Sequence, residues 1–302
     1  MKPESPFHVA FKNKLRLAGM MILLMSAFTT IAGGGWTQEK GYGFNSLSFT
    51  FISAHRYFSQ SGQDIFLARN VTDITLNHYL EYGITDRFTF ISNLPFKYIA
   101  TGKTVFGNHQ SSTILADGNL LGTSNNQFGM RINLLKKNFI LSVQALISLP
   151  TIMQDDSRGL ITGYDAFIVA PEIQIAKSFK KFYFSSGFGV SLKTNQFSDD
   201  INAALEIGTT IKKKFFFAGE LVFRKSLFNK KRDDMNFAQT ALYVNDQEYF
   251  SPLIKAGYFF DEKWSAYFTL GLAFSGNYVA HFPGLSFSVL RKFQIRKKES
   301  ES

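Results

Sequence analysis

The sequence predicts an all-β protein, a transmembrane antiparallel up-and-down β-barrel of about 12 strands, and three observations lead to this prediction. Segments of about ten residues with large apolar side chains at every second position recur from residue 44 to residue 293, and a period of two is that of a β-strand. Short connections alternate with long ones, as in barrels with short periplasmic turns and long outer loops. Mean hydropathy is close to zero although 45% of the residues are hydrophobic, because lipid-facing and lumen-facing residues alternate in such a barrel.

Residues 182–192 show how these strands differ from those of a soluble protein. One face is mostly large and apolar, with Phe182, Phe184, Ser186, Phe188, Val190 and Leu192. The other face is small or polar, with Tyr183, Ser185, Gly187, Gly189 and Ser191. A soluble β-sandwich, the alternative fold, would have to bury all such apolar faces against one another, and they exceed what two layers need. We therefore expect lipid to cover the apolar faces.

The first residues have the pattern of a secretory signal peptide. Three basic residues between positions 12 and 16 precede an apolar run over residues 17–32, which ends in small residues. We predict cleavage after Ala32, which removes residues 1–32. A retained anchoring helix is the alternative, but a run of about 15 residues is short for crossing a bilayer. Residues 33–43 would then form a periplasmic N-terminal segment.

The barrel is predicted over residues 44–293, and each strand follows from the same alternation. In chain order the predicted strands cover 44–57, 72–85, 88–99, 126–135, 139–149, 166–178, 182–192, 201–211, 215–225, 248–260, 264–275 and 282–293. Short turns with Asp, Asn or Lys lie at 86–87, 136–138, 179–181, 212–214 and 261–263. Longer outer loops alternate with them, among them 58–71, 100–125 and 226–247. An even number of strands lets the sheet close, so that no backbone group is left unpaired in lipid, and residues 294–302 follow as a charged tail.

Prolines and tryptophans bear on the strand boundaries. Pro95, Pro171 and Pro252 lie inside predicted strands, where proline cannot donate a ladder hydrogen bond, so we expect bulges or strand ends there. Trp36 and Trp264 are expected in the aromatic girdles at the membrane interfaces.

Charge and composition exclude several function classes. The formal net charge is +10, but the basic residues lie in the leader, the short turns and the tail rather than on one face of a folded element, so no nucleic-acid partner is predicted. The chain has no cysteine, which excludes disulfides, thiolate metal sites and a cysteine nucleophile. The five histidines are scattered, and no metal or other cofactor is predicted.

One hairpin resembles a known family. Residues 80–90 read Leu-Glu-Tyr-Gly-Ile-Thr-Asp-Arg-Phe-Thr-Phe, and residues 94–96 read Leu-Pro-Phe. This pattern is similar to a hairpin of outer-membrane barrel proteins, above all of the transporter-like family named after the meta-pathway of phenol degradation. Residues 116–120 resemble the Gly-Asp segment before that family's next hairpin, although the order here is Asp-Gly. The resemblance covers residues 70–150 and is only architectural beyond them.

The resemblance implies an outer-membrane barrel of a Gram-negative bacterium, acting as a channel for small or hydrophobic compounds. Its partners would be outer-membrane lipid, a small-molecule solute and the outer-membrane assembly machinery, which reads a final aromatic residue such as Phe293. The predicted function is therefore the passive passage of small solutes. The alternative is a non-catalytic structural or surface-binding barrel with a plugged lumen, whose outer loops do the work.

Charged residues on the predicted lumen face are the candidate functional residues. They are Glu81, Arg131, Glu172, Glu206, Glu220, Arg224 and Lys255. Charges that face a water-filled lumen are tolerated, whereas the same charges facing lipid are costly. They could form a selectivity ring that filters solutes, or a salt-bridge network that fills and rigidifies the barrel; both interpretations remain open.

No catalytic residue is predicted. His78 and Ser92 both fall on the outward faces of neighbouring strands, as a lipid-facing hydrolase would need. Pairing across the turn at 86–87 places His78 opposite Pro95 or Phe96, however, and away from the serine.

Overall fold

Residues 34–104, 115–232 and 239–295 are described by a computed structural model. The signal peptide predicted over 1–32 lies outside the described residues, and so does most of the charged tail. None of the described residues belongs to a helix long and apolar enough to cross a membrane.

Twelve long strands form the wall of a closed barrel. They are β1 (Tyr42–Phe58), β2 (Asp64–Thr85), β3 (Phe88–Thr101), β5 (Asn126–Lys136), β6 (Ile140–Leu149), β9 (Ile168–Ser178), β10 (Tyr183–Lys193), β11 (Asp200–Ile211), β12 (Phe215–Ser226), β13 (Glu248–Phe259), β14 (Trp264–Gly271) and β17 (Gly284–Gln294). Each pairs antiparallel with its neighbours in this order, and β17 pairs with β1 to close the ring. The predicted fold class, an antiparallel up-and-down barrel of twelve strands, is confirmed.

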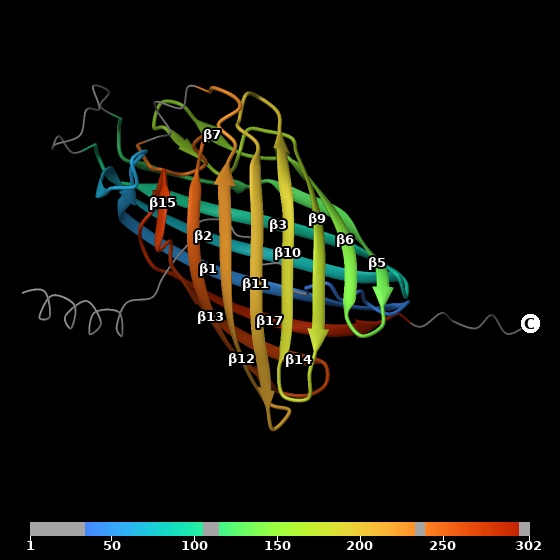
Figure 1. The fold of residues 1–302 in the computed structure, drawn as a ribbon. Helices are drawn as coiled ribbons and strands as arrows, with labels where there is room; N and C mark the ends of the chain where they lie inside the picture. The colour runs from blue at the N-terminus through green and yellow to red at the C-terminus, as the bar shows by residue number, and fades with distance from the viewer. Residues whose placement is uncertain (1–33, 105–114, 233–238, 296–302) are drawn as a thin grey trace, which may run out of the picture.

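Short turns and long loops lie at opposite ends of the barrel (Figure 1). The loop end carries five short strands, β4 (Gly118–Thr123), β7 (Gln154–Asp155), β8 (Leu160–Ile161), β15 (Ser275–Asn277) and β16 (Val279–Ala280). Both ends of the barrel sheet lie at the turn end, because Tyr42 at the start of β1 pairs with Gln294 at the end of β17. This is the arrangement of barrels whose short turns face the periplasm.

The first hairpin is longer than the alternation predicts. The outer loop expected at 58–71 contains only residues 59–63, because β2 begins at Asp64 and pairs with the end of β1. A register shift between Ala54 and Arg56 interrupts the period of two, which hid this extension in the sequence. The eleventh strand is conversely shorter: β14 ends at Gly271, not at residue 275.

The three strand prolines mark places where a ladder is interrupted, as expected. Pro95 lies where β3 changes its partner from β5 to β4, and Pro252 lies where β13 changes from β15 to β14. At Pro171 the pairing of β9 with β10 is interrupted between Val169 and Glu172. Each proline therefore sits where its missing N–H leaves no gap in a continuous ladder.

The outer face of the barrel is apolar and the inner face is polar. On β1, which lies between β17 and β2, the side chains of Leu47, Phe49 and Phe51 are exposed, whereas the side chain of Ser46 is buried. Several charged side chains are fully buried inside, a distribution opposite to that of a soluble sandwich. An exposed belt of this kind on a closed barrel is the surface that contacts lipid, so the soluble alternative does not apply.

The outer loops pack into one apolar cluster over the loop end. Its side chains include Ile99, Leu160, Tyr164, Phe197 and Leu242, which come from β3 and from three different loops. The loops between β6 and β9, β10 and β11, and β12 and β13 are thus held together by burial of apolar area.

Candidate functional site

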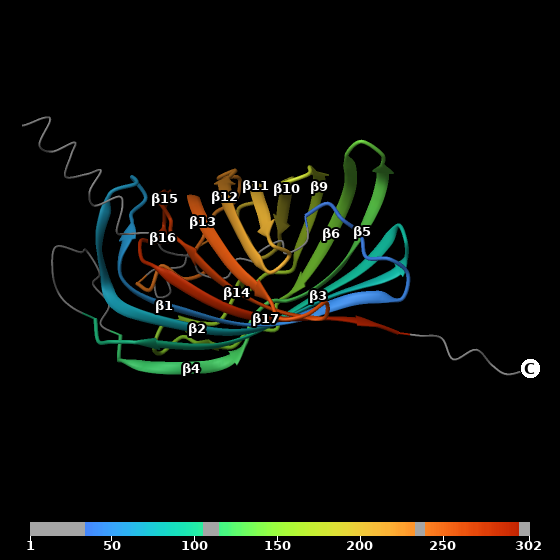
Figure 2. The same ribbon diagram turned by 90° about the horizontal axis from the view of Figure 1, so that it is seen from below.

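The candidate site is the lumen, and its periplasmic half is occupied by chain that precedes β1. Residues Gly34–Gly41, here called the N-terminal segment, run from the wall formed by β9 and β10 to the turn between β2 and β3. Figure 2 shows this segment in blue ahead of β1. A Cβ placed on Gly34, whose φ is +55°, would collide with the Ser185 side chain, so only glycine fits there.

Hydrogen bonds hold the N-terminal segment to inward-facing side chains. Ser142 Oγ donates to the carbonyl of Gly35 at 2.6 Å, and Nη1 of Arg131 donates to the carbonyl of Trp36 at 2.8 Å. The indole of Trp36 packs edge-on against Tyr183, with ring centroids 5.7 Å apart. Trp36 therefore lies in the lumen, and its predicted place in a membrane-interface girdle was wrong.

Glu81 and Arg131 form the first charged cluster, next to the N-terminal segment. Both side chains are fully buried, and Nη1 of Arg131 lies 2.9 Å from Oε1 of Glu81. Tyr79 donates a hydrogen bond to Oε1 and Gln38 to Oε2 of that carboxylate. Arg131 also donates from Nε and Nη2 to Gln144. The sequence placed both charges in the lumen but did not show that they pair.

Glu206, Glu220 and Lys255 form the second cluster, on β11, β12 and β13. Nζ of Lys255 lies 2.5 Å from Oε2 of Glu206 and 2.7 Å from Oε2 of Glu220. Tyr183 donates a further hydrogen bond to Glu206. Two carboxylates share one ammonium, so the cluster carries a formal net charge of −1.

Glu172 stands apart from both clusters. Its Oε1 accepts a hydrogen bond of 2.7 Å from Gln174, and the described residues contain no cation in ion-pair contact with it. A Cβ on Gly187 would lie 2.2 Å from this carboxylate, so glycine makes room for it. Of the four candidate glutamates, only Glu172 lines the larger lumen cavity.

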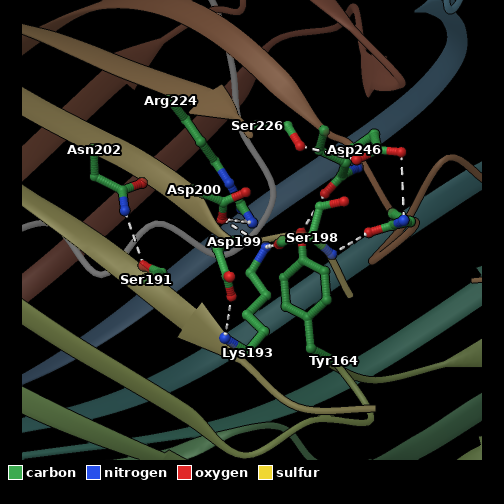
Figure 3. Close-up of polar contacts among 12 residues, drawn as sticks. Tyr164, Ser191, Lys193, Ser198, Asp199, Asp200, Asn202, Arg224, Ser226 and Asp246 are labelled. Carbon is green, nitrogen blue, oxygen red and sulfur yellow. Dashed lines mark hydrogen bonds and ion pairs between the residues drawn. The ribbon is translucent and has the colours of Figure 1, made fainter. Parts of the chain in front are cut away.

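Arg224 belongs to a third cluster near the outer ends of the strands, shown in Figure 3. Oδ2 of Asp200 lies 2.5 Å from Nη2 of Arg224 and 2.6 Å from Nζ of Lys193. Both cations also lie over the ring of Tyr164, at 5.1 and 5.3 Å from its centroid. This places an outer-loop aromatic directly on the charged cluster.

Two loops beside this cluster add two further charges, Asp199 and Lys230. Asp199 accepts hydrogen bonds from the Lys230 ammonium, the Lys193 backbone N–H and Asn229 (Figure 3 shows the bond from Lys193). Partial burial acts to raise the pKa of Asp199, but these hydrogen bonds outweigh burial and lower it. The outer loops are thus fastened to the cluster by charge as well as by apolar contact.

Sequence reasoning missed at least four of the buried charges. Asp200 lies one residue before the predicted start of its strand and Lys193 one residue after the predicted end of its strand. Lys97 of β3 pairs with Asp73 of β2 at 2.6 Å, and both are fully buried. If the alternation is continued one residue beyond these two predicted boundaries, Lys193 and Asp200 both fall on the lumen face. Lys97 lies inside its predicted strand and on the lumen face of the same alternation.

A cavity of about 290 Å³ lies in the lumen. Its wall over β17, β1 and β2 is polar, with Ser48, Thr50, Asn77, Ser286 and Ser288. Its wall over β9 and β11 to β13 contains apolar side chains, among them Ile168, Ala203, Val222 and Leu253. Glu172, Lys193, Asp200 and Arg224 also line it. A second space of only about 10 Å³ lies beside Gly34 and Glu206.

Neither a metal-binding group nor a His78–Ser92 pair is found among residues 34–104, 115–232 and 239–295. No group of three or more His, Asp and Glu side chains there could hold a metal ion. His78 pairs with Leu94, one position from the predicted partners, while Ser92 pairs with Leu80. The histidine and the serine are therefore not opposite each other.

Known structures share this fold. The chain is similar to a COG4313 outer membrane channel from Pseudomonas putida F1, with a TM-score of 0.67 and 15% identity over 86% of this chain and 98% of that one. It is also similar to the KdgM porin (TM-score 0.44, 11% identity, 82% and 99% covered) and to the toluene transporter TodX of P. putida (0.44, 7%, 86% and 92%). No family model and no curated protein matches the chain, so the resemblance to the phenol meta-pathway family is not confirmed.

Proposed function

We propose that the protein is a passive channel for small solutes in the outer membrane of a Gram-negative bacterium. The observation that carries this proposal is the 290 Å³ lumen cavity inside a closed barrel, lined by polar groups and by the unpaired carboxylate of Glu172. A barrel serving only as a scaffold would gain stability by filling this space with side chains. The shared fold with an outer membrane channel is consistent with the proposal.

The cavity also suggests which solutes pass. Its polar wall can exchange hydrogen bonds with a hydroxyl or amide, and its apolar wall can contact a hydrocarbon. Small amphipathic compounds and small hydrophobic compounds both fit this lining, and the phenol meta-pathway family remains the proposed relationship. The second candidate function, a binding barrel with a plugged lumen, is favoured by the N-terminal segment and by the packed outer loops.

Gel mobility tests the barrel itself. We expect the mature protein in the outer-membrane fraction, migrating faster on a gel before boiling than after it, because a closed barrel resists detergent unfolding at room temperature. Mature protein found only in soluble fractions would contradict the membrane assignment.

Lumen carboxylates are proposed to set ion preference. Glu206→Gln and Glu220→Gln together leave Lys255 without its partners, so the cation-to-anion permeability ratio in planar bilayers should fall severalfold. Glu172→Gln should lower it further, because that carboxylate faces the cavity unpaired. Glu262→Gln, in the turn between β13 and β14, removes the same charge outside the lumen and serves as the control. Unchanged conductance and ion preference after all three lumen substitutions would leave only the rigidifying role.

A further inference from the structure

Exposed lysines gather on the turn end of the barrel, at three neighbouring turns. We call this group the basic rim; it consists of Lys180, Lys181, Lys212, Lys213, Lys214 and Lys263. The turns are adjacent because β10 pairs with β11 and β12 pairs with β13. A hydrogen bond of 2.8 Å from the N–H of Phe259 to the carbonyl of Lys214 ties two of them together.

The basic rim carries an excess of positive charge, although two carboxylates, Asp261 and Glu262, lie in the turn that also holds Lys263. Within the described part of the chain, every ion pair uses other cations. The nearby Asp261 uses its Oδ1 to accept the backbone N–H groups of Lys263 and Trp264. Six lysines against these two carboxylates leave an excess of four positive charges, which favours an external anionic partner.

The turn at Lys212 and Lys213 has a backbone conformation that lysine rarely adopts. Lys212 and Lys213 have φ values of +51° and +57°, and the Lys214 N–H donates to the carbonyl of Ile211 at 3.0 Å. This is a β-turn with both central residues left-handed, a conformation that favours Asn and Gly over side chains with a bulky Cβ substituent. Strain that a simple substitution would relieve suggests that the charge has a use.

Lipid-facing aromatic side chains lie directly next to these lysines. Phe179 and Phe182 flank Lys180 and Lys181, are both exposed and stack on each other at 4.5 Å. Trp264 follows Lys263 and is also exposed. Outer-membrane barrels carry girdles of aromatic residues at both membrane interfaces, and tryptophan lies at the level of lipid headgroups. The neighbouring ammonium groups are therefore placed where phosphates are found.

We propose that the basic rim binds the phosphate-bearing headgroups of anionic phospholipids in the periplasmic leaflet of the outer membrane. Each ammonium would contact a lipid phosphate while the adjacent aromatic rings contact the acyl chains of the same lipid. The alternation of cations with lipid-facing rings favours a lipid over an acidic protein, which would need cations that face the periplasm without apolar neighbours. This binding is independent of the proposed passage of solutes.

Tryptophan fluorescence can test this proposal in the intact mature barrel. Of the two tryptophans, Trp264 lies at the rim and Trp36 in the lumen, so bromine carried on acyl chains quenches only the rim probe. In phosphatidylcholine vesicles, we expect brominated phosphatidylglycerol to quench Trp264 at about fivefold lower mole fraction than brominated phosphatidylcholine. This factor is the preference for anionic lipid that one lysine near an anionic surface supplies. Lys213→Gly/Lys263→Gln removes two of the six cations, one of them next to Trp264, and should reduce the preference. It should fold, because glycine suits the left-handed position.

A matched control removes two exposed lysines at the opposite end. Lys103→Gln/Lys231→Gln should keep the full preference, and added glycerol phosphate at the lipid concentration should not reduce it. Equal quenching by the two lipids in the wild-type protein would overturn the proposal. So would an equal loss in the Lys103/Lys231 control, or displacement by the soluble phosphate.

Discussion

A barrel that lacks residues 34–40 should conduct ions severalfold better than the intact protein in planar bilayers. The N-terminal segment crosses the periplasmic half of the lumen, where Gly35, Trp36 and Gln38 bond to three different strands. Its removal leaves the twelve strands and their ladders intact, because β1 begins only at Tyr42. The same deletion should speed the swelling of liposomes in a small sugar.

Refolding from inclusion bodies avoids any effect of the deletion on export. Trp36→Ala is the graded variant: it removes the ring packed on Tyr183 but keeps the backbone hydrogen bonds, so a smaller increase in conductance is expected. If the deletion variant conducts no better than the wild-type protein, the packed outer loops close the lumen and the plugged binding barrel becomes the better interpretation.

Arg131→Met should lower the free energy of unfolding by about 3–5 kcal/mol, the usual cost of removing one partner of a fully buried ion pair. The Glu81 carboxylate would remain buried, without the guanidinium that lies 2.9 Å away. The loss is measured by urea titration of the protein in phospholipid vesicles, with the folded fraction at each urea concentration read from its mobility on a gel.

Two further variants identify the cause. Glu81→Gln/Arg131→Met removes both charges and should recover most of the lost stability, because no uncompensated ion is left in the lumen. Arg158→Gln breaks the exposed pair with Asp155 and should cost at most about 1 kcal/mol. A loss in Arg131→Met no larger than that in Arg158→Gln would show that water or a shifted side chain compensates Glu81.

The lumen residues show how far sequence reasoning reaches. Glu81 and Arg131 could be placed on the inner face because the period of two assigns a face to every residue of a strand. Their pairing could not be predicted, because it depends on the registers of β2 with β3 and of β3 with β5, and one residue of slip reverses every face. The division of the seven candidates into separate clusters has the same origin.

Other lumen residues lie in parts of the chain where apolar and polar residues do not alternate clearly. Trp36 was misplaced because the segment before β1 has no alternation, and only its contacts with Tyr183 and Arg131 show that it lies inside. Asp200 and Lys193 were missed because they lie at strand ends, where turn chemistry and alternation overlap.

The sequence by itself determined that the chain forms twelve amphipathic strands with an apolar outer face, and at which end the short turns lie. These properties are local, since side-chain direction and turn preference depend on a few adjacent residues. Only the tertiary structure decided which charges meet, that the N-terminal segment enters the lumen, and that outer loops cap the opposite end. Those outcomes depend on strand register and on the packing of segments far apart in the chain, which no short window of sequence contains.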